Sequence, residues 1–516
     1  MMKLRIRFII LLLVLTINII PALAVENGKI KEGEILSLAD CVGIAINNSP
    51  VIKKYEYNLQ VAKSNVGIAK SAYFPTLGAG VGIYQEYNSN KLSENTSSAR
   101  ELPSAGIYLQ QLIWDFGKTN SLIKMERFYK LAAEYEFMDS ICNTIYNVKM
   151  KYFNVLNTKA ILEVEKTNEL LNRKNVERTK QLYESGKKNR IDYIDAKVFL
   201  SDAEMRVSDA ENKYDIALAD LANAMYSAYA PDFEVEKLYT FNFNDTFIPD
   251  YVKQEAVDNN IKNVALKTKV EMNEESQLKV LPFNLKEAYD LAFRNSPDLW
   301  VLETTVNAMK QALIYAKRQY YPAITGNVGY NYLNAREYSN HDFNMYIDMT
   351  ASLNIKQLKH EIDRAQANVN LAENDVYEFK QNLYFEVKKC FLNVDKNEDQ
   401  IYIAKQQAEE ALEDFNLANR RYEEGRTDYI ALQQARKNYN DAKLLYVKML
   451  YEYNVSLADL EIAMHYHLDD LHAQAEHALH YHYSEILDKL ESAIHCDHRE
   501  EEESKNPNKG VKDNDL

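Results

Sequence analysis

Residues 183–189 read Tyr-Glu-Ser-Gly-Lys-Lys-Asn, and residues 422–428 read Tyr-Glu-Glu-Gly-Arg-Thr-Asp. Each heptapeptide holds the single glycine of a long stretch without proline, which runs from Lys118 to Ala230 in the first case and from Tyr330 to Asn506 in the second. Glycine and proline are the residues that most often end helices. Each stretch therefore predicts two long helices joined at a glycine. The helices on either side of Gly186 would extend about 100 and 60 Å at 1.5 Å per residue.

The two heptapeptides belong to an internal duplication. Asn48-Ser49-Pro50 recurs 247 positions later as Asn295-Ser296-Pro297, and Ala219-Asp220-Leu221 recurs 239 positions later as Ala458-Asp459-Leu460. A repeat of this length has to be interpreted before any local motif. We predict these segments: a signal peptide at 1–24, a first repeat at 25–240, a linker at 241–283, a second repeat at 284–464 and a tail at 465–516.

Each repeat begins with a predicted helix, up to Tyr73 or Tyr320, and continues with two predicted strands. Apolar and polar residues alternate in segment 77–84 of the first repeat and in segments 324–332 and 343–354 of the second. Segment 106–114 is the predicted second strand of the first repeat, and residues 88–103 are the predicted hairpin loop between its two strands. Alternation gives a strand one apolar and one polar face. Such a sheet suits either a bilayer or a soluble core. Four strands cannot close a barrel, so a membrane sheet would require further copies of the chain.

Small residues follow a seven-residue period after each glycine. They are Ala196, Ala203, Ala210, Ala217 and Ala224 in the first repeat, and Ala435, Ala442, Met449, Ser456 and Ala463 at the equivalent positions of the second, where methionine and serine replace two alanines. Larger residues lie four positions after the first four members of each series. This period is typical of coiled coils, and a seam of small residues lets helix backbones approach closely. We expect each of these helices to pack against two neighbours.

The N-terminus predicts export. Lys3, Arg5 and Arg7 precede an apolar run at 8–20, and Ala22-Leu23-Ala24 is typical of a cleavage site. The net charge of −15 argues against nucleic acid as a partner. We interpret the four cysteines (Cys41, Cys142, Cys390 and Cys496) as unpaired because none forms a Cys-x-x-Cys motif. Nucleotide-binding, zinc-protease and serine-hydrolase motifs are absent from the sequence, which predicts neither an enzyme nor a cofactor.

Taken together, the signal peptide, the duplicated order of helix, two strands and helical hairpin, the Ser-Pro pairs and the Tyr-x-x-Gly tips resemble the outer membrane efflux protein family, the TolC-like channels. The resemblance covers about Leu36 to Met464. It implies a mainly α fold of long coiled-coil hairpins with a small antiparallel β part of four strands per chain. Three chains would form a twelve-stranded outer membrane barrel and a periplasmic α-helical tunnel.

The resemblance also implies a function. The homotrimer would be the passive exit duct of a tripartite efflux or type I secretion system, coupled through a periplasmic adaptor (membrane fusion) protein to an inner membrane transporter. The alternative is a periplasmic coiled-coil protein without a pore, with a structural or adhesive role.

The family docks its adaptor at the two hairpin tips, so the resemblance assigns docking to Tyr183, Gly186 and Asn189 and to Tyr422, Gly425 and Asp428. Glycine suits the left-handed position after a helix, and Asn189 or Asp428 can cap the helix that follows. An ordinary structural turn would have the same residues. Tyr183 or Tyr422 could also take part in a hydrogen-bond network that closes the tunnel.

Closed members of the family often carry two aspartates, six and nine residues after the second tip glycine. This chain has Ala431 and Gln434 there, and the pair occurs instead in the first repeat as Asp192 and Asp195. Carboxylates from three chains would form a cation-binding constriction of the tunnel. A solvated acidic helix face explains the same pattern.

Eight of the ten histidines lie between His465 and His498. Imidazoles at helical spacing can bind transition metals. Their spacing matches no defined site, so we predict no metal site from the tract alone.

Overall fold

The computed structural model describes residues 30, 32–88, 98–227, 232–236, 284–335, 338–351 and 354–465. The predicted signal peptide lies outside these residues, as do the predicted linker and the tail after His465.

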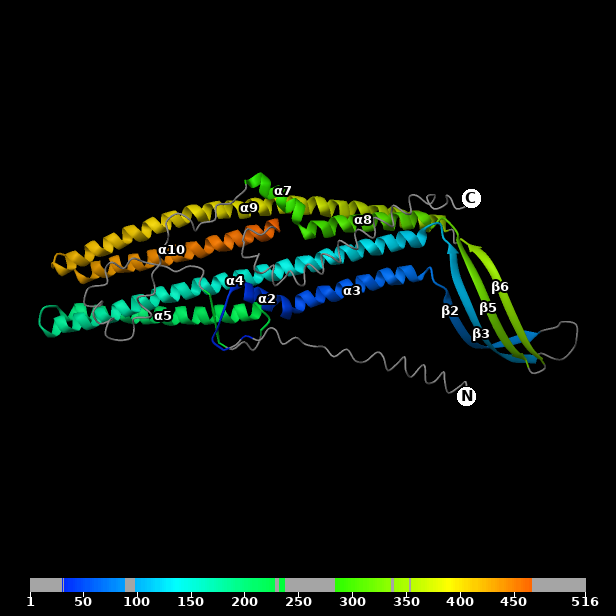
Figure 1. Cartoon of the computed structure of the whole chain (residues 1–516), viewed down its shortest axis with the longest axis horizontal. Coiled ribbons are helices and arrows are strands. Elements are labelled where there is room, and N and C mark those ends of the chain that lie inside the picture. Colours follow the sequence, from blue (N-terminus) through cyan, green and yellow to red (C-terminus); the bar gives the residue numbers. More distant parts are fainter. Residues whose placement is uncertain are drawn as a thin grey trace, which may run out of the picture.

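Eight helices of the described residues form two similar sets. The first repeat contributes α2 (Leu38–Asn48), α3 (Pro50–Ser71), α4 (Lys118–Glu184) and α5 (Arg190–Ala224), and the second contributes α7 (Leu285–Asn295), α8 (Pro297–Arg318), α9 (Ile355–Glu423) and α10 (Tyr429–Met464). The 67 residues of α4 extend about 100 Å. Figure 1 shows a rod with the two hairpin tips at one end and the sheet at the other. Within the described helices, no segment is both long and apolar enough to span a membrane.

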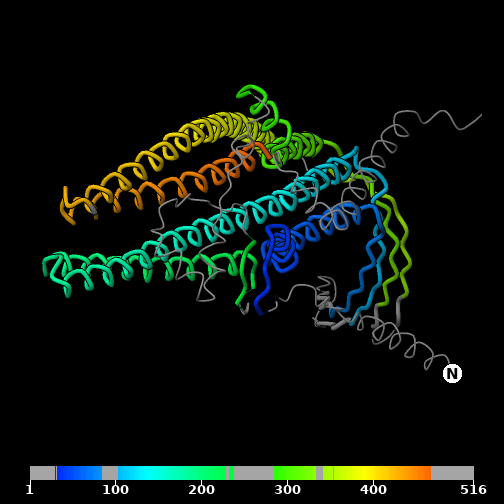
Figure 2. Tube along the Cα trace, turned by 60° about the vertical axis from the view of Figure 1, so that its left-hand side comes forward, coloured from blue at the N-terminus to red at the C-terminus, as the bar shows by residue number. Residues whose placement is uncertain are grey.

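Each long helix has two shorter partners that follow one another along it. The helices α3 and α5 pack on α4, and α8 and α10 pack on α9. The two repeats meet where α8 and α10 also contact α4. Figure 2 shows the two hairpins running in the same direction toward their tips. The predicted pair of long hairpins is therefore confirmed.

The single opening helix that we predicted for each repeat is wrong, because a Ser-Pro pair divides it in two. The Ser49 Oγ accepts a hydrogen bond from the Ile52 N–H (3.2 Å), and the Ser296 Oγ accepts one from the Leu299 N–H (3.3 Å). Proline disfavours helical backbone at the residue before it but suits the first helical position. The serine thus ends one helix and caps the next, and both serines are fully buried.

Four strands form one antiparallel sheet in the order β2-β3-β5-β6. They are β2 (Thr76–Asn88), β3 (Ser98–Trp114), β5 (Ala323–Ala335) and β6 (Tyr338–Thr350). The predicted hairpin loop at 88–103 is too long, because β3 already begins at Ser98. Pro103 pairs with Ile83 of β2 and lies just before Ser104, where pairing with β5 starts. A strand tolerates proline where it lacks a second neighbour.

The two faces of the sheet differ as predicted. Leu77, Leu109, Val328 and Met345 are successive partners across the four strands and form one apolar row. Leu77 and Met345 are 70% and 73% exposed. On the opposite face, the Thr325 Oγ1 and the Asn327 Nδ2 donate hydrogen bonds to the Asp348 Oδ1, at 2.7 and 2.6 Å. β2 and β6 each pair on one side within the described chain.

A second, very small sheet was not predicted. The strand β1 (Glu34–Leu36) pairs in parallel with β4 (Phe233–Val235), so the two ends of the first repeat meet. Three-residue strands are too short to show a period in the sequence. Phe233 and Val235 are buried in the same core as α2 and α4.

Repeat-equivalent residues build the two hydrophobic cores. Val148, Val155 and Leu221 lie in the core of the first repeat, and their counterparts Val387, Val394 and Leu460 lie in the core of the second. All six are 0% exposed. Every member of the two predicted seams of small residues is also buried. The seven-residue period is therefore confirmed as a packing pattern.

Candidate functional site

The two tips have the same backbone. Gly186 and Gly425 have φ angles of +71° and +72°, and both follow the last turn of a long helix. The Gly186 N–H donates to the backbone carbonyl of Tyr183 (2.9 Å), and the Gly425 N–H donates to the backbone carbonyl of Tyr422 (3.1 Å). The next residue in each tip donates to the carbonyl five positions before it, at 2.8 Å. This is a Schellman motif, in which a left-handed glycine satisfies the last carbonyls of the helix.

The residues that begin the following helices differ in their bonding. Asp428 is the N-cap of α10, and its Oδ1 accepts from the Ala431 N–H at 2.9 Å. Asn189 is the N-cap residue of α5, but its side chain makes no capping hydrogen bond. The prediction that both side chains cap is thus correct for Asp428 and wrong for Asn189. Asparagine is in general as good an N-cap residue as aspartate, and Asn284 caps α7, so the residue type does not explain the difference. The acidic residue in the first turn of α5 is Asp192.

Aromatic side chains connect the helices at the tips. Tyr183 stacks on Tyr193 of α5, with 6.0 Å between ring centroids and 6° between ring planes. Tyr422 lies 5.8 Å from Tyr429 of α10. The Lys188 Nζ lies 3.9 Å from the centroid of the Tyr422 ring, a cation–π contact that joins the first tip to the second. This contact therefore links the loop of the first tip to a predicted residue of the second, Tyr422, whereas the ring that Tyr183 stacks on belongs to its own repeat.

Tyr429 is the buried centre of this region, and the sequence analysis missed it. Its side chain is 2% exposed, and its hydroxyl accepts a hydrogen bond from the Asn175 Nδ2 of α4 at 2.6 Å. Burial raises the pKa of Tyr429 above its ordinary value. The predicted participants Tyr183 and Tyr422 are more exposed. Tyr429 directly follows the capping aspartate, and the equivalent residue of the first repeat is Arg190. This replacement of a charged residue by an aromatic one is the feature of the sequence that could have identified Tyr429.

Polar contacts between α4 and α10 continue away from the tips. The Asn172 Oδ1 accepts from the Arg436 Nη1 at 3.2 Å, and Asn440 donates to both carboxylate oxygens of Glu165 at 3.4 and 3.5 Å. Glu165 is 4% exposed, and burial raises its pKa. Arg206 of α5 lies 3.9 Å from Glu165, which opposes this shift. One buried carboxylate therefore joins α4, α5 and α10.

Asp192 and Asp195 lie in the first two turns of α5, and both are half-buried. Asp195 is close enough to Tyr429 to contribute to its raised pKa. The two aspartates that continue the column are paired within the helix: Asp202 with Arg206 at 3.0 Å, and Asp209 with Lys213 at 2.6 Å. In the part of the chain that the structure describes, no such ion pair involves Asp192 or Asp195. Asp192 and Asp195 therefore differ from Asp202 and Asp209, which each have a basic partner within the helix.

The fold defines a class of protein in which two long helical hairpins are joined to a small antiparallel sheet with one apolar face. Residues 42–225 and 288–464 match the model of the outer membrane efflux protein family. The chain belongs to this family, which confirms the predicted resemblance and fold class. Membership in a family of transport proteins also confirms the prediction that the chain is not an enzyme.

Individual relatives agree with this assignment. The outer membrane protein TolC of Vibrio cholerae is 25% identical over 166 residues, which are 32% of this chain and 38% of that protein. The matched region thus spans little more than a third of that relative. The CmeC outer membrane channel of Campylobacter jejuni has a similar fold, with a TM-score of 0.65, 14% identity and coverage of 86% of this chain and 89% of CmeC. The open state of the MtrE outer membrane channel of Neisseria gonorrhoeae gives a TM-score of 0.64 at 14% identity, over 83% and 89% of the two chains.

Proposed function

We propose that this chain is one subunit of a trimeric outer membrane channel that serves as the passive exit duct of a tripartite efflux or secretion system. Family membership supports the class of protein. The observation that carries the proposal is the four-stranded sheet with an exposed apolar face, placed at one end of helices about 100 Å long. A soluble protein has little reason to hold such a face at the end of a rod.

The edges of the sheet support assembly from several chains. β2 and β6 leave one side of each strand unpaired within the described chain, and unpaired backbone groups are not tolerated in lipid. Strands of 13 and 17 residues exceed the roughly 10 residues that a tilted membrane strand requires. Three copies would supply twelve strands and close the barrel. The apolar face would then contact outer membrane lipid, and the helices would extend through the periplasm after removal of signal peptide 1–24.

An exposed apolar stripe on α5 offers a surface for the neighbouring subunit. Ile191, Val198 and Met205 are 68%, 61% and 67% exposed and follow one another at seven-residue spacing. Seven residues are close to two helical turns, so the stripe keeps to one face of the helix. Val198 lies two positions after Ala196, or about 200° around the helix, so this face is opposite the buried alanines. This stripe would pack against another chain in the trimer.

The tips are the proposed docking site for the periplasmic adaptor of an inner membrane transporter. Gly186 and Gly425 are exposed and have open space around them, and the loops carry Lys187, Lys188 and Arg426. In the trimer, Asp192 and Asp195 of three chains would form the constriction of the tunnel, because like charges held close together attract cations.

Fractionation and conductance test the proposal for the whole protein. We expect recovery of a trimer from outer membrane extracts and single-channel conductance in planar bilayers. Recovery as a soluble periplasmic monomer would instead support the coiled-coil protein without a pore.

The constriction can be tested with a matched pair of double variants. Asp192→Asn with Asp195→Asn should weaken block of the channel by multivalent cations. The control, Asp202→Asn with Asp209→Asn, removes two carboxylates that already have cationic partners. Equal block in both variants would return the first pair to a solvated helix face.

A further inference from the structure

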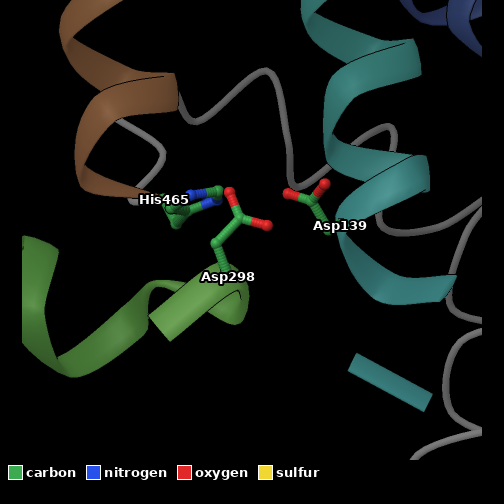
Figure 3. Close-up of side chains that lie close together, drawn as sticks. All are labelled: Asp139, Asp298 and His465. Atoms are coloured by element: carbon green, nitrogen blue, oxygen red, sulfur yellow. The ribbon is translucent and has the colours of Figure 1, made fainter. Parts of the chain in front are cut away.

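Three side chains that commonly bind metal ions meet at mid-length of the rod. They are Asp139 of α4, Asp298 in the first turn of α8 and His465, which follows the last residue of α10. Their ligand atoms all lie within 4.8 Å of one another. Figure 3 shows the Asp298 carboxylate beside the His465 imidazole, with the Asp139 carboxylate on the other side. The cluster is about 70 Å along α4 from the first tip, so it is separate from the proposed docking site.

The surroundings of Asp139 favour a cation. Its Oδ2 accepts a hydrogen bond from the Asn143 Nδ2 at 2.6 Å, whereas its Oδ1 is buried and accepts none from the residues that the structure describes. The ligand oxygens of Asp139 and Asp298 lie within 4.8 Å of each other, so two like charges face one another. Within the same described residues, neither carboxylate forms an ion pair with a lysine or arginine. A buried acceptor without a donor requires an explanation, and a bound ion is one.

The other repeat lacks this chemistry at the equivalent place. The counterpart of His465 is Tyr226, and the two residues share the left-handed backbone, with φ angles of +45° and +54°. The counterpart of Asp298 is Val51. The backbone of the duplication is therefore retained in both repeats, and only the second places an imidazole and a carboxylate next to α4.

We propose that Asp139, Asp298 and His465 bind one divalent transition-metal ion, for which Zn²⁺ is the reference. Two carboxylates and one imidazole are a suitable ligand set, and water would complete the coordination. Ligand atoms around tetrahedral zinc lie about 3.4 Å apart, because each bond is about 2.1 Å long. Rotation of the side chains would close the present spacing. The ion would join α4 of the first repeat to α8 and α10 of the second.

The test must separate this site from the histidines of the tail. We would use the full chain in detergent, with the tail histidines after His465 replaced by glutamine. These are His467, His472, His477, His480, His482, His495 and His498. Calorimetric titration with Zn²⁺ should give one ion per chain in this background.

Three variants of the background should lose that ion or bind it at least tenfold more weakly: Asp139→Asn, Asp298→Asn and His465→Tyr. The last copies the residue that the first repeat tolerates at the same backbone angle. Asp209→Asn, which removes an exposed carboxylate of α5, is the matched control and should bind Zn²⁺ unchanged.

Thermal unfolding gives a second measurement, because an ion that binds only the folded chain raises its midpoint. We expect Zn²⁺ to raise the midpoint of the background and of Asp209→Asn but not of Asp298→Asn. The proposal is overturned if the background binds no Zn²⁺, or if Asp139→Asn and Asp298→Asn both keep the full equivalent.

Discussion

The helices α5 and α10 occupy equivalent places in the two repeats but differ in how much of their surface the chain itself covers. Only seven of the 35 residues of α5 are buried, whereas 21 of the 36 residues of α10 are buried. The helix α10 packs on α9 and on α4, while α5 packs mainly on α4. A single coiled-coil pattern has therefore produced one helix that completes the fold of its own chain and one that presents an apolar stripe.

The lesson is that a duplicated sequence need not give duplicated environments. The expectation that each of these helices has two neighbours is met within the chain for α10, and we propose that the second neighbour of α5 is another subunit. Four sets of substitutions test this contrast, and we take them in order of expected effect.

The largest effect should come from charging the α5 stripe. Val198→Asp together with Met205→Asp places two carboxylates on a face that we propose to be buried between subunits, and buried charges without partners are strongly disfavoured. We expect loss of the trimer in native electrophoresis and light scattering. Lys197→Glu, which changes charge at an exposed position of the same helix, should leave the trimer intact. A trimer that survives the double substitution would show that this stripe is not the interface.

Truncation of equivalent leucines in the two hydrophobic cores should affect both repeats alike. Leu221→Ala and Leu460→Ala each remove a fully buried side chain, and such changes cost about 2–5 kcal/mol in the free energy of unfolding. Thermal or denaturant unfolding in detergent would measure the loss. Leu417→Ala, at a position 44% exposed, is the control and should cost much less. A clear difference in unfolding free energy between the two leucine variants would mean that the cores are less similar than their contacts indicate.

Substitution of the tip glycines should have a smaller effect on stability. Gly186→Ala and Gly425→Ala meet no atom within 4 Å, so the cost comes from the left-handed backbone and should be about 1 kcal/mol. Gly67→Ala is the matched control because Gly67 lies inside helix α3 without a positive φ and has the same open space. Alanine there should stabilise the helix by about 0.5–1 kcal/mol. Opposite signs for tip and control in an unfolding experiment would confirm that φ, and not space, selects glycine at the tips.

The smallest effects should distinguish the two N-cap residues. Asp428→Ala removes a capping hydrogen bond and should cost about 1 kcal/mol. Asn189→Ala removes a side chain that makes no such bond and should change stability by only a few tenths of a kcal/mol. Unfolding midpoints of the two variants, measured side by side, test this difference. Equal losses would indicate that Asn189 caps α5 in solution.

Several elements were accessible from the sequence because their signals are local. The single glycine of each long stretch located both tips, and the seven-residue period identified the buried seam. The strands were recognised from alternation, although Ser98 to Pro103 were assigned to a loop because polar residues dominate there. The Ser-Pro pairs were noticed as repeat markers, but their effect on the helix was not predicted. A buried cap at Ser49 depends on neighbours that lie elsewhere in the chain.

The sequence by itself determined that two copies of a helix, two strands and a helical hairpin follow one another, since glycine, proline and periodicity act on neighbouring residues. The tertiary structure alone decided which surfaces meet. It placed Tyr429 beside Asn175 and brought together Asp139 of α4, Asp298 of α8 and His465, which directly follows α10. The physical reason is that periodicity fixes which face of a helix is apolar, whereas contacts between distant residues depend on how far each helix is shifted along the next.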